Sequence, residues 1–311
     1  MTGKEKQTPL GWQGIFALLP TDWKLGAVGG DQRTGYLRID DERMPRLQVK
    51  WAPHRIDLVR KRDEYVKRLT AGRRGRPTGL EVDVEAKFFG GRAKPKKDLV
   101  TFAWRGPQCG YGLMWNCETC GRSLIAQVTW RPEERWHDVA REVLASLEDH
   151  AEGGWKTWAL DGLAFLAPEK YELGKWRWLT GYLEFNLAQM KRTLKVARWG
   201  IVSRILGGRT LSEWYQQENW RRRDVSFQVQ EMELKGHDGI AVWGEVSGIK
   251  PRLTALAERA LRRKPVVQFA GGAWHCPESN RLYLVETVDA GEGVALQGVV
   301  DSISCHAEAE A

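Results

Sequence analysis

The chain has 311 residues, of which 42% are hydrophobic and 28% are charged, and its formal net charge is +8. This composition is typical of a folded, soluble protein and excludes a largely disordered chain, and the length suffices for two domains. No apolar run approaches the roughly 18 residues of a membrane span. The polar start of the chain, MTGKEKQTPLGWQG, lacks the apolar core of a secretory signal. We therefore expect a cytoplasmic protein without a membrane partner.

The sequence contains an internal repeat. The segment 14–51 returns in altered form at 162–198, with a proline six residues and a second glycine twelve residues after the first glycine in both copies. The tetrapeptide TGYL at 34–37 also recurs at 180–183. Composition alone does not explain these spacings, so we expect a tandem duplication. The predicted division is a polar tail at 1–10, a first repeat at 11–152 and a second repeat at 153–311.

In the first repeat, apolar strand-like runs give way after Pro53 to a helical spacing of apolar residues, whose opposite face is cationic. A basic loop with two glycines and a proline follows at 71–77, and a second basic loop, GGRAKPKKD, follows at 90–98. The predicted strands are 14–20, 36–40, 46–52, 80–89, 99–104, 111–117 and 123–130, with one helix after Pro53 and another through Val139, Val143, Leu144 and Leu147.

The second repeat follows the same order. Thr210 and Glu213 have the spacing of a capping box, in which the two side chains satisfy free amides at a helix start. The predicted strands are 163–167, 182–186, 193–197, 225–234, 239–246, 266–269 and 281–287. A helix is inserted at about 251–264, and a last helix at 295–306 matches 139–150.

Each repeat is therefore predicted to be an α+β domain, a curved antiparallel sheet flanked by helices. The element order, together with a strand–Pro-x-x-aromatic turn at Pro20–Trp23 and again at Pro168–Tyr171, resembles the PsbP/Mog-like α/β/α sandwich superfamily. The resemblance covers most of each repeat. It implies a non-enzymatic binding or assembly protein and names no partner.

The positive charge is concentrated at 55–97. This segment contains 14 Lys or Arg and 6 Asp or Glu, and the excess equals the net charge of the chain. Two cationic loops that flank one strand offer several groups to the phosphates of a nucleic acid. A solvated helix face with two solubilising loops is the alternative interpretation. The candidate contacts are Arg60, Lys61, Arg62, Arg73, Arg74, Arg76, Arg92, Lys94, Lys96 and Lys97.

The motif WNCETCGR places Cys117 and Cys120 in the Cys-x-x-Cys-Gly pattern of a zinc knuckle, with Cys109 as a possible third ligand. A metal bound here would be structural. Otherwise the motif is a hairpin turn with small, partly buried thiols. The matching motif of the second repeat, WHCPESNR, has Ser279 where Cys120 stands, so we expect no cysteine pair there.

Two further patterns concern single residues. Glu85 and Lys87 stand two apart in a predicted strand and would share a face, as in metal-dependent nucleases with a D/E-x-K motif. His150 and His306 close the two terminal helices, where the helix dipole favours a cation.

These patterns predict a non-catalytic binding protein that associates electrostatically with nucleic acid through the basic segment. One alternative is a protein–protein assembly or adaptor module. The other is a metal-dependent nuclease built on Glu85 and Lys87. No cofactor is expected apart from a possible zinc ion.

Overall fold

The computed structural model describes residues 7–71, 78–89, 98–150, 152–219, 225–246, 268–289 and 296–306. The chain divides into two compact units, Met1–Gly162 and Leu163–Ala311. Of the described residues, 53% lie in strands and 18% in helices, and the strands form three antiparallel sheets. The predicted α+β class, with sheets flanked by helices, is therefore wrong. The protein consists mainly of antiparallel sheet.

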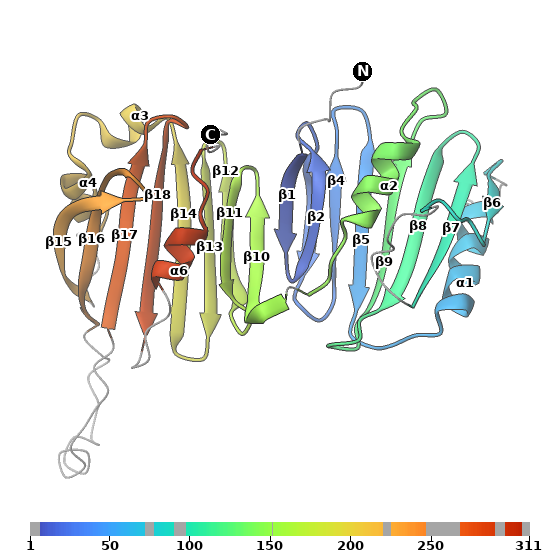
Figure 1. Ribbon diagram of the computed structural model, residues 1–311, viewed down its shortest axis with the longest axis horizontal. Coiled ribbons are helices and arrows are strands. Elements are labelled where there is room, and N and C mark those ends of the chain that lie inside the picture. The colour runs from blue at the N-terminus through green and yellow to red at the C-terminus, as the bar shows by residue number, and fades with distance from the viewer. Residues whose placement is uncertain are drawn as a thin grey trace, which may run out of the picture. The chain divides into compact units, whose positions relative to one another are not determined.

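Unit 1 is built around a seven-stranded antiparallel sheet of order β3-β4-β5-β9-β8-β7-β6, and β1 pairs with β2 and β10 in a smaller sheet (Figure 1). Its elements are β1 (Gln7–Trp12), β2 (Ile15–Pro20), β3 (Lys24–Gly30), β4 (Gly35–Asp40), β5 (Pro45–Ala52), α1 (Leu58–Ala71), β6 (Glu81–Asp83), β7 (Leu99–Arg105), β8 (Cys109–Asn116), β9 (Ser123–Trp130), α2 (His137–Ala145), the 3₁₀ helix η2 (Glu152–Gly154) and β10 (Trp155–Leu160).

Unit 2 has a second seven-stranded sheet, of order β12-β13-β14-β18-β17-β16-β15. Each strand stands where its counterpart stands in the sheet of unit 1, so residues that match between the repeats occupy equivalent places. The elements are β11 (Leu163–Pro168), β12 (Glu172–Leu179), β13 (Tyr182–Gln189), β14 (Arg192–Gly200), α3 (Val202–Leu206), α4 (Leu211–Asn219), β15 (Val225–Leu234), β16 (His237–Val246), β17 (Gln268–Cys276), β18 (Arg281–Asp289) and α6 (Leu296–Ser302).

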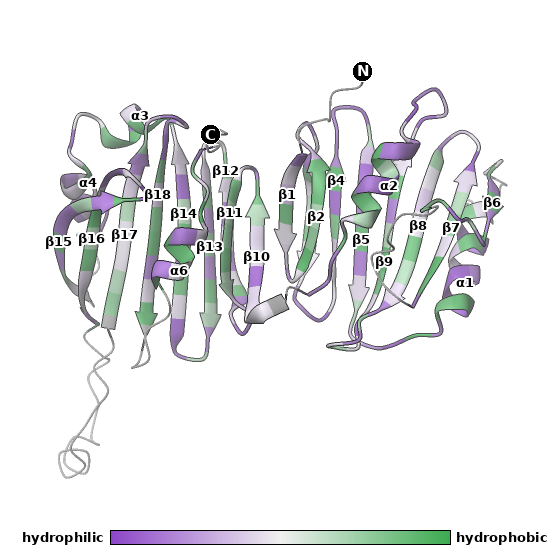
Figure 2. Cartoon of the chain, viewed as in Figure 1, coloured by the Kyte–Doolittle hydropathy of each residue, from purple (hydrophilic) through white to green (hydrophobic). Residues whose placement is uncertain are grey.

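The strands follow from a two-residue alternation of apolar and polar side chains, visible as banding in Figure 2. In β5, Leu47, Val49 and Trp51 are buried, whereas Lys50 between them is exposed. The β1–β2 hairpin turns through Gln13 and Gly14, whose φ angles of 53° and 82° are those of a type I′ turn. Only glycine adopts such a value at no cost, which explains Gly14.

One face of each large sheet is covered partly by a helix and partly by strands, which is why the predicted class failed. Helix α2 buries Ala140, Val143 and Leu144. In unit 2, Phe165 of β11 meets Phe185 of β13 edge to face at 5.5 Å, so a strand covers this part of the sheet. An apolar run in the sequence does not reveal whether a strand joins a sheet or covers one.

The helices on the opposite faces are α1 in unit 1 and α4 in unit 2. Tyr65 of α1 contacts Phe102 at 5.5 Å and donates a hydrogen bond to Gln127 (2.5 Å). At the start of α4, Thr210 N donates to Glu213 Oε2 (2.9 Å) and Glu213 N donates to Thr210 Oγ1 (3.2 Å). The predicted capping box is thereby confirmed.

Several predicted elements differ from the structure, among them the strand expected at 266–269, which continues as β17 to Cys276. The strand expected at 80–89 is limited to β6, because Asp83 Oδ1 accepts a hydrogen bond from Glu85 N (3.0 Å) and the chain turns there. Helices α2 and α6 end at Ala145 and Ser302. His150 and His306 therefore lie beyond the helices, and their predicted role at the helix dipoles is wrong. The inserted helix at about 251–264 lies outside the described residues.

Candidate functional site

The cationic residues predicted on α1 are largely engaged with neighbours. Arg60 and Lys61 both contact the carboxylate of Glu64, at 3.3 and 3.2 Å. The Arg62 side chain is only 13% exposed and donates a hydrogen bond to the carbonyl oxygen of Val84 (2.9 Å), so it fastens α1 to the segment after β6. The other predicted phosphate contacts, Arg73, Arg74, Arg76, Arg92, Lys94, Lys96 and Lys97, lie outside the described residues.

A pocket of about 360 Å³ lies beside α1. Its wall is mainly apolar and includes Trp51, Tyr65 and Met114, and Lys50, Lys61 and Arg68 add three cationic groups to the lining. A pocket of this composition suits a flat apolar group that carries negative charge.

The predicted nuclease pair does not share a strand. Glu85 lies in the turn after β6, and both Glu85 and Lys87 are exposed outside any strand. The alternation that would place them on one face therefore does not apply. The nearby carboxylate of Asp83 accepts a hydrogen bond from the amide of Glu85 (3.0 Å), so it closes the turn.

The Cys-x-x-Cys-Gly motif of unit 1 forms a tight turn after β8. The amide of Gly121 donates to the carbonyl of Cys117 (3.0 Å), and the amide of Cys120 donates to Cys117 Sγ (3.5 Å). The third potential ligand is His150, whose Nδ1 lies 3.3 Å from Cys117 Sγ, and the three donor atoms lie within 4.8 Å of one another. Cys109, predicted as third ligand, begins β8 and is not in this group.

The chain just before His150 is held by Arg122, a buried residue of the same turn. Its guanidinium donates hydrogen bonds to the carbonyl oxygens of Gln13 (3.0 Å) and Asp149 (2.9 Å). Burial, together with the Asp149 carboxylate, raises the pKa of the Cys117 thiol to about 11. A bound cation would be needed to favour the thiolate here.

Unit 2 has four potential metal ligands at the equivalent place, although the sequence predicted no cysteine pair there. His237, Cys276 and Cys305 are buried, His306 is half-buried, and their donor atoms lie within 4.8 Å of one another. The prediction was wrong because the second cysteine, Cys305, comes from the segment after α6 and not from the hairpin. Burial and the neighbouring Cys276 raise the pKa of the Cys305 thiol.

A buried polar network beneath α4 was not predicted either. Lys195 Nζ lies 3.8 Å from Glu184 and 3.5 Å from Glu286, and Tyr215 donates to Glu286 Oε1 (2.5 Å). Burial alone would raise the pKa of Glu184, but hydrogen bonds from Tyr182 and Asn186 outweigh it, and the pKa is lowered. The charges are compensated internally, so removing one partner would leave a buried charge unpaired. In the sequence, the network is indicated by Glu286, a charged residue inside the apolar run LYLVETV at 282–288.

Exposed apolar side chains are distributed unevenly between the units. Of the large hydrophobic residues that the described ranges expose, Tyr36 and Val59 belong to unit 1, and Leu166, Trp178, Leu179, Met190, Ile201, Met232 and Trp243 belong to unit 2. Trp178 (38% exposed) and Leu179 (64% exposed) end β12, which stands at the edge of its sheet. Exposed tryptophan and leucine at a sheet edge are typical of an interaction surface.

No protein-family model and no curated protein matches the chain. Two solved structures are similar to it at a low level. One is the apo structure of the immunity protein TplEi of T6SS from Pseudomonas aeruginosa, at 10% identity and a TM-score of 0.33 over 96% of this chain and 96% of that chain. The other is a chain of the Tle4–Tli4 complex, at 9% identity and a TM-score of 0.34 over 97% and 98%. Similarity at this level does not identify a shared function. No helix within the described ranges is long and apolar enough to cross a membrane.

Proposed function

We propose that this protein is a non-catalytic binding protein whose partner is another protein, and that the partner docks on β12 of unit 2. The observation that carries the proposal is the contrast between β12 and β3, which occupy the same edge of their sheets and contain the same bulge at Gly174 and Gly26. After the bulge, β3 continues as AVGG, whereas β12 continues as KWRWL. Only β12 presents large apolar side chains.

The geometry of β12 favours an extended partner segment. Within the described part of unit 2, β12 pairs only with β13, so its outer backbone groups can pair with an added strand. Side chains alternate between the faces, which places Lys175, Arg177 and Leu179 on one side and Trp176 and Trp178 on the other. A partner strand with apolar residues against the two tryptophans, and with acidic residues and one apolar residue on the other face, matches this pattern.

The test compares capture of a stoichiometric partner from the native cell by three forms of the full chain. The double variant Trp178→Thr, Leu179→Thr keeps strand propensity and removes the apolar surface. We expect partner recovery to fall at least tenfold, because large buried anchors contribute about 2 kcal/mol or more each to an interface.

The control double variant is Met190→Asn, Met232→Thr, which removes exposed apolar side chains of unit 2 outside β12, and asparagine suits the left-handed φ of 54° at position 190. It is expected to recover the partner at the wild-type level. Equal recovery by the β12 variant and the wild type would exclude β12 as the docking strand.

Single-stranded nucleic acid at the α1 pocket is the second candidate. It is favoured by the pocket itself, since Lys50, Lys61 and Arg68 surround an apolar wall that contains Tyr65, and by the charge excess of segment 55–97. A base stacked in the pocket with phosphates on the cations is the arrangement that such surfaces use for single strands.

Fluorescence anisotropy with labelled single-stranded and double-stranded DNA and RNA tests this candidate at several salt concentrations. Replacing Lys50, Lys61 and Arg68 by Gln is expected to weaken binding and to reduce the salt slope by about 2, since three phosphate contacts are lost. The matched control replaces the exposed Lys24, Arg131 and Arg135 of the same unit by Gln. Absence of binding by the wild type at low salt would reject the candidate.

A further inference from the structure

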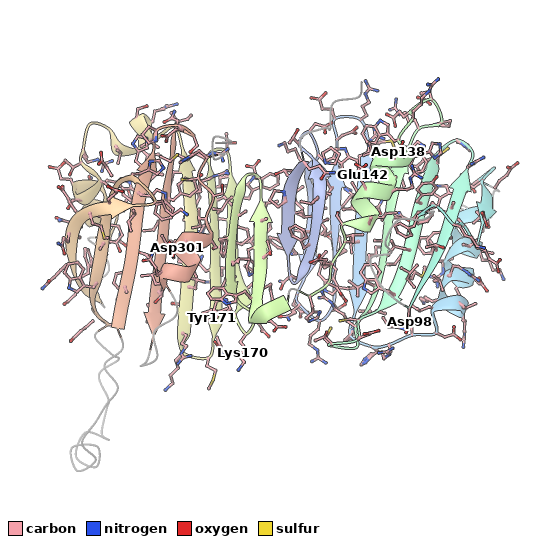
Figure 3. The ribbon with its side chains drawn as sticks, viewed as in Figure 1. Asp98, Asp138, Glu142, Lys170, Tyr171 and Asp301 are labelled. Atoms are coloured by element: carbon pink, nitrogen blue, oxygen red, sulfur yellow. The ribbon has the colours of Figure 1, made fainter. Side chains whose placement is uncertain are left out.

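Three segments of unit 2 bring nitrogen and sulfur donors to one point. His237 begins β16, Cys276 ends β17, and Cys305 and His306 follow α6. The turn before β16 is fixed to α6 by a hydrogen bond from Lys235 Nζ to the carbonyl oxygen of Asp301 (2.9 Å), and Asp301 is labelled on α6 in Figure 3. The Tyr283 hydroxyl donates to the carbonyl of Cys305 (3.3 Å) and holds the last segment in place.

The separations between the donor atoms match those of a tetrahedral metal site. His237 Nε2 lies 3.3 Å from Cys305 Sγ, and His306 Nδ1 lies 3.4 Å from Cys276 Sγ and 3.3 Å from Cys305 Sγ. With zinc–sulfur bonds of about 2.3 Å and zinc–nitrogen bonds of about 2.0 Å, neighbouring sulfur and nitrogen ligands are about 3.5 Å apart. The four atoms therefore need to move little to accept an ion.

The carboxylate of Glu278 lies beside the ring of His237, an arrangement that is common around metal-binding histidines. The Nδ1 atom of His237 lies 3.8 Å from Glu278 Oε2, while its Nε2 atom faces Cys305. A carboxylate beside the non-ligating nitrogen fixes the tautomer and the orientation of a ligating imidazole. Glu278 stands in the hairpin between β17 and β18, two residues after Cys276.

We propose that unit 2 binds one zinc ion through His237 Nε2, Cys276 Sγ, Cys305 Sγ and His306 Nδ1. Two thiolates and two imidazoles in tetrahedral order select zinc over magnesium and calcium, which prefer oxygen ligands. Four protein ligands leave no open position, so the ion is structural. It ties the segment after α6 to the ends of β16 and β17.

The equivalent place in unit 1 provides a comparison within the same chain. Cys117 and His150 match Cys276 and His306, but Asp149 stands where unit 2 has Cys305. Unit 1 offers three clustered donors, one of which, Cys120, is exposed. A site with fewer protein ligands binds zinc more weakly, so the tightly held ion belongs to unit 2.

The test measures the zinc content of the full chain, produced without a histidine tag, by elemental mass spectrometry after dialysis under reducing conditions. We expect about one zinc ion per chain and, after exchange for cobalt, the visible and near-ultraviolet bands of tetrahedral thiolate-bound cobalt. Cys305→Ser is expected to lose the ion and the cobalt bands, whereas Cys305→Asp, which offers a carboxylate oxygen in place of the thiolate, is expected to bind zinc more weakly and to lose part of the cobalt–thiolate absorption. Cys120→Ser and the buried control Cys109→Ser are expected to retain them.

Circular dichroism of each variant identifies those that fold, and Cys305→Asp imitates the residue found in unit 1. A folded and reduced wild-type chain that stays zinc-free in excess zinc would overturn the proposal. So would zinc that is lost in Cys120→Ser and retained in Cys305→Ser, or a disulfide between Cys276 and Cys305 in the isolated protein.

Discussion

Arg46 is the most completely buried charged side chain described in unit 1, at 1% exposure. It contacts Asp41 at 2.5 Å and Glu134 at 2.6 Å, and its guanidinium lies 4.0 Å above the ring of Trp136. Each partner carboxylate is itself about nine-tenths buried. Removal of Arg46 would therefore leave the buried carboxylates of Asp41 and Glu134 without their cation, which lowers the stability of the fold.

Replacing Arg46 by Met is predicted to reduce the free energy of unfolding by about 3–5 kcal/mol, because two buried carboxylates would lose their cation. Urea denaturation of the full chain measures the change. Arg43→Met is the matched control, since Arg43 is 66% exposed and lies 3.9 Å from the same Glu134. Equal effects of the two substitutions would contradict the account, because an exposed pair contributes about 0–1 kcal/mol.

Single residues were predictable from the sequence where their partners are local. Thr210 and Glu213 are three residues apart, and their reciprocal hydrogen bonds formed as expected. His237 and Cys305 are 68 residues apart and meet only because β16 and the segment after α6 converge. Spacing along the chain carries no information about such a contact, so the donor set of unit 2 was missed.

Between elements, the Arg46 pairs connect the β4–β5 turn to the loop before α2. The pKa of Asp41 is lowered, because hydrogen bonds from Arg46 and from the amides of Arg43 and Met44 outweigh the effect of burial. The pKa of Glu134 is also lowered, and the largest cause is the hydrogen bond from Arg46. Both carboxylates are thus bound more tightly in their ionised form in the folded state.

This linkage predicts a loss of stability in acid. A group whose folded pKa is lowered contributes stability above its unfolded pKa, about 3.9 for Asp and 4.3 for Glu, and the contribution is lost as pH falls through the folded pKa. The free energy of unfolding should therefore decrease as pH falls below about 4. In Arg46→Met this decrease should be smaller. An unchanged acid dependence in that variant would show that other carboxylates dominate it.

At the level of elements, most strands were predictable from alternation, and the failures have identifiable causes. Ala86, Phe88 and Phe89 are buried without belonging to a strand, and their pattern extended the predicted strand beyond Asp83. The fold class failed because part of the covering layer consists of strands. Which strands pair with one another depends on contacts between distant segments, and the alternation of apolar and polar residues within a strand does not reveal them.

At the scale of the whole molecule, two sheets of the same strand order carry different surfaces. The charge excess of unit 1 was visible in the sequence, since it depends only on composition. The exposed apolar residues of unit 2 were not, because the sequence pattern does not distinguish a tryptophan at an open edge from one in the core. Trp115, Trp130, Trp158 and Trp274 are fully buried, whereas Trp178 is not.

Amide hydrogen exchange tests directly whether β12 forms the docking edge. Exchange is measured for the chain alone and in complex with its captured partner. We predict slower exchange along Glu172–Leu179 in the complex and unchanged exchange along Lys24–Gly30, the equivalent strand β3. Unchanged exchange along β12 in a complex that is fully formed would contradict the account.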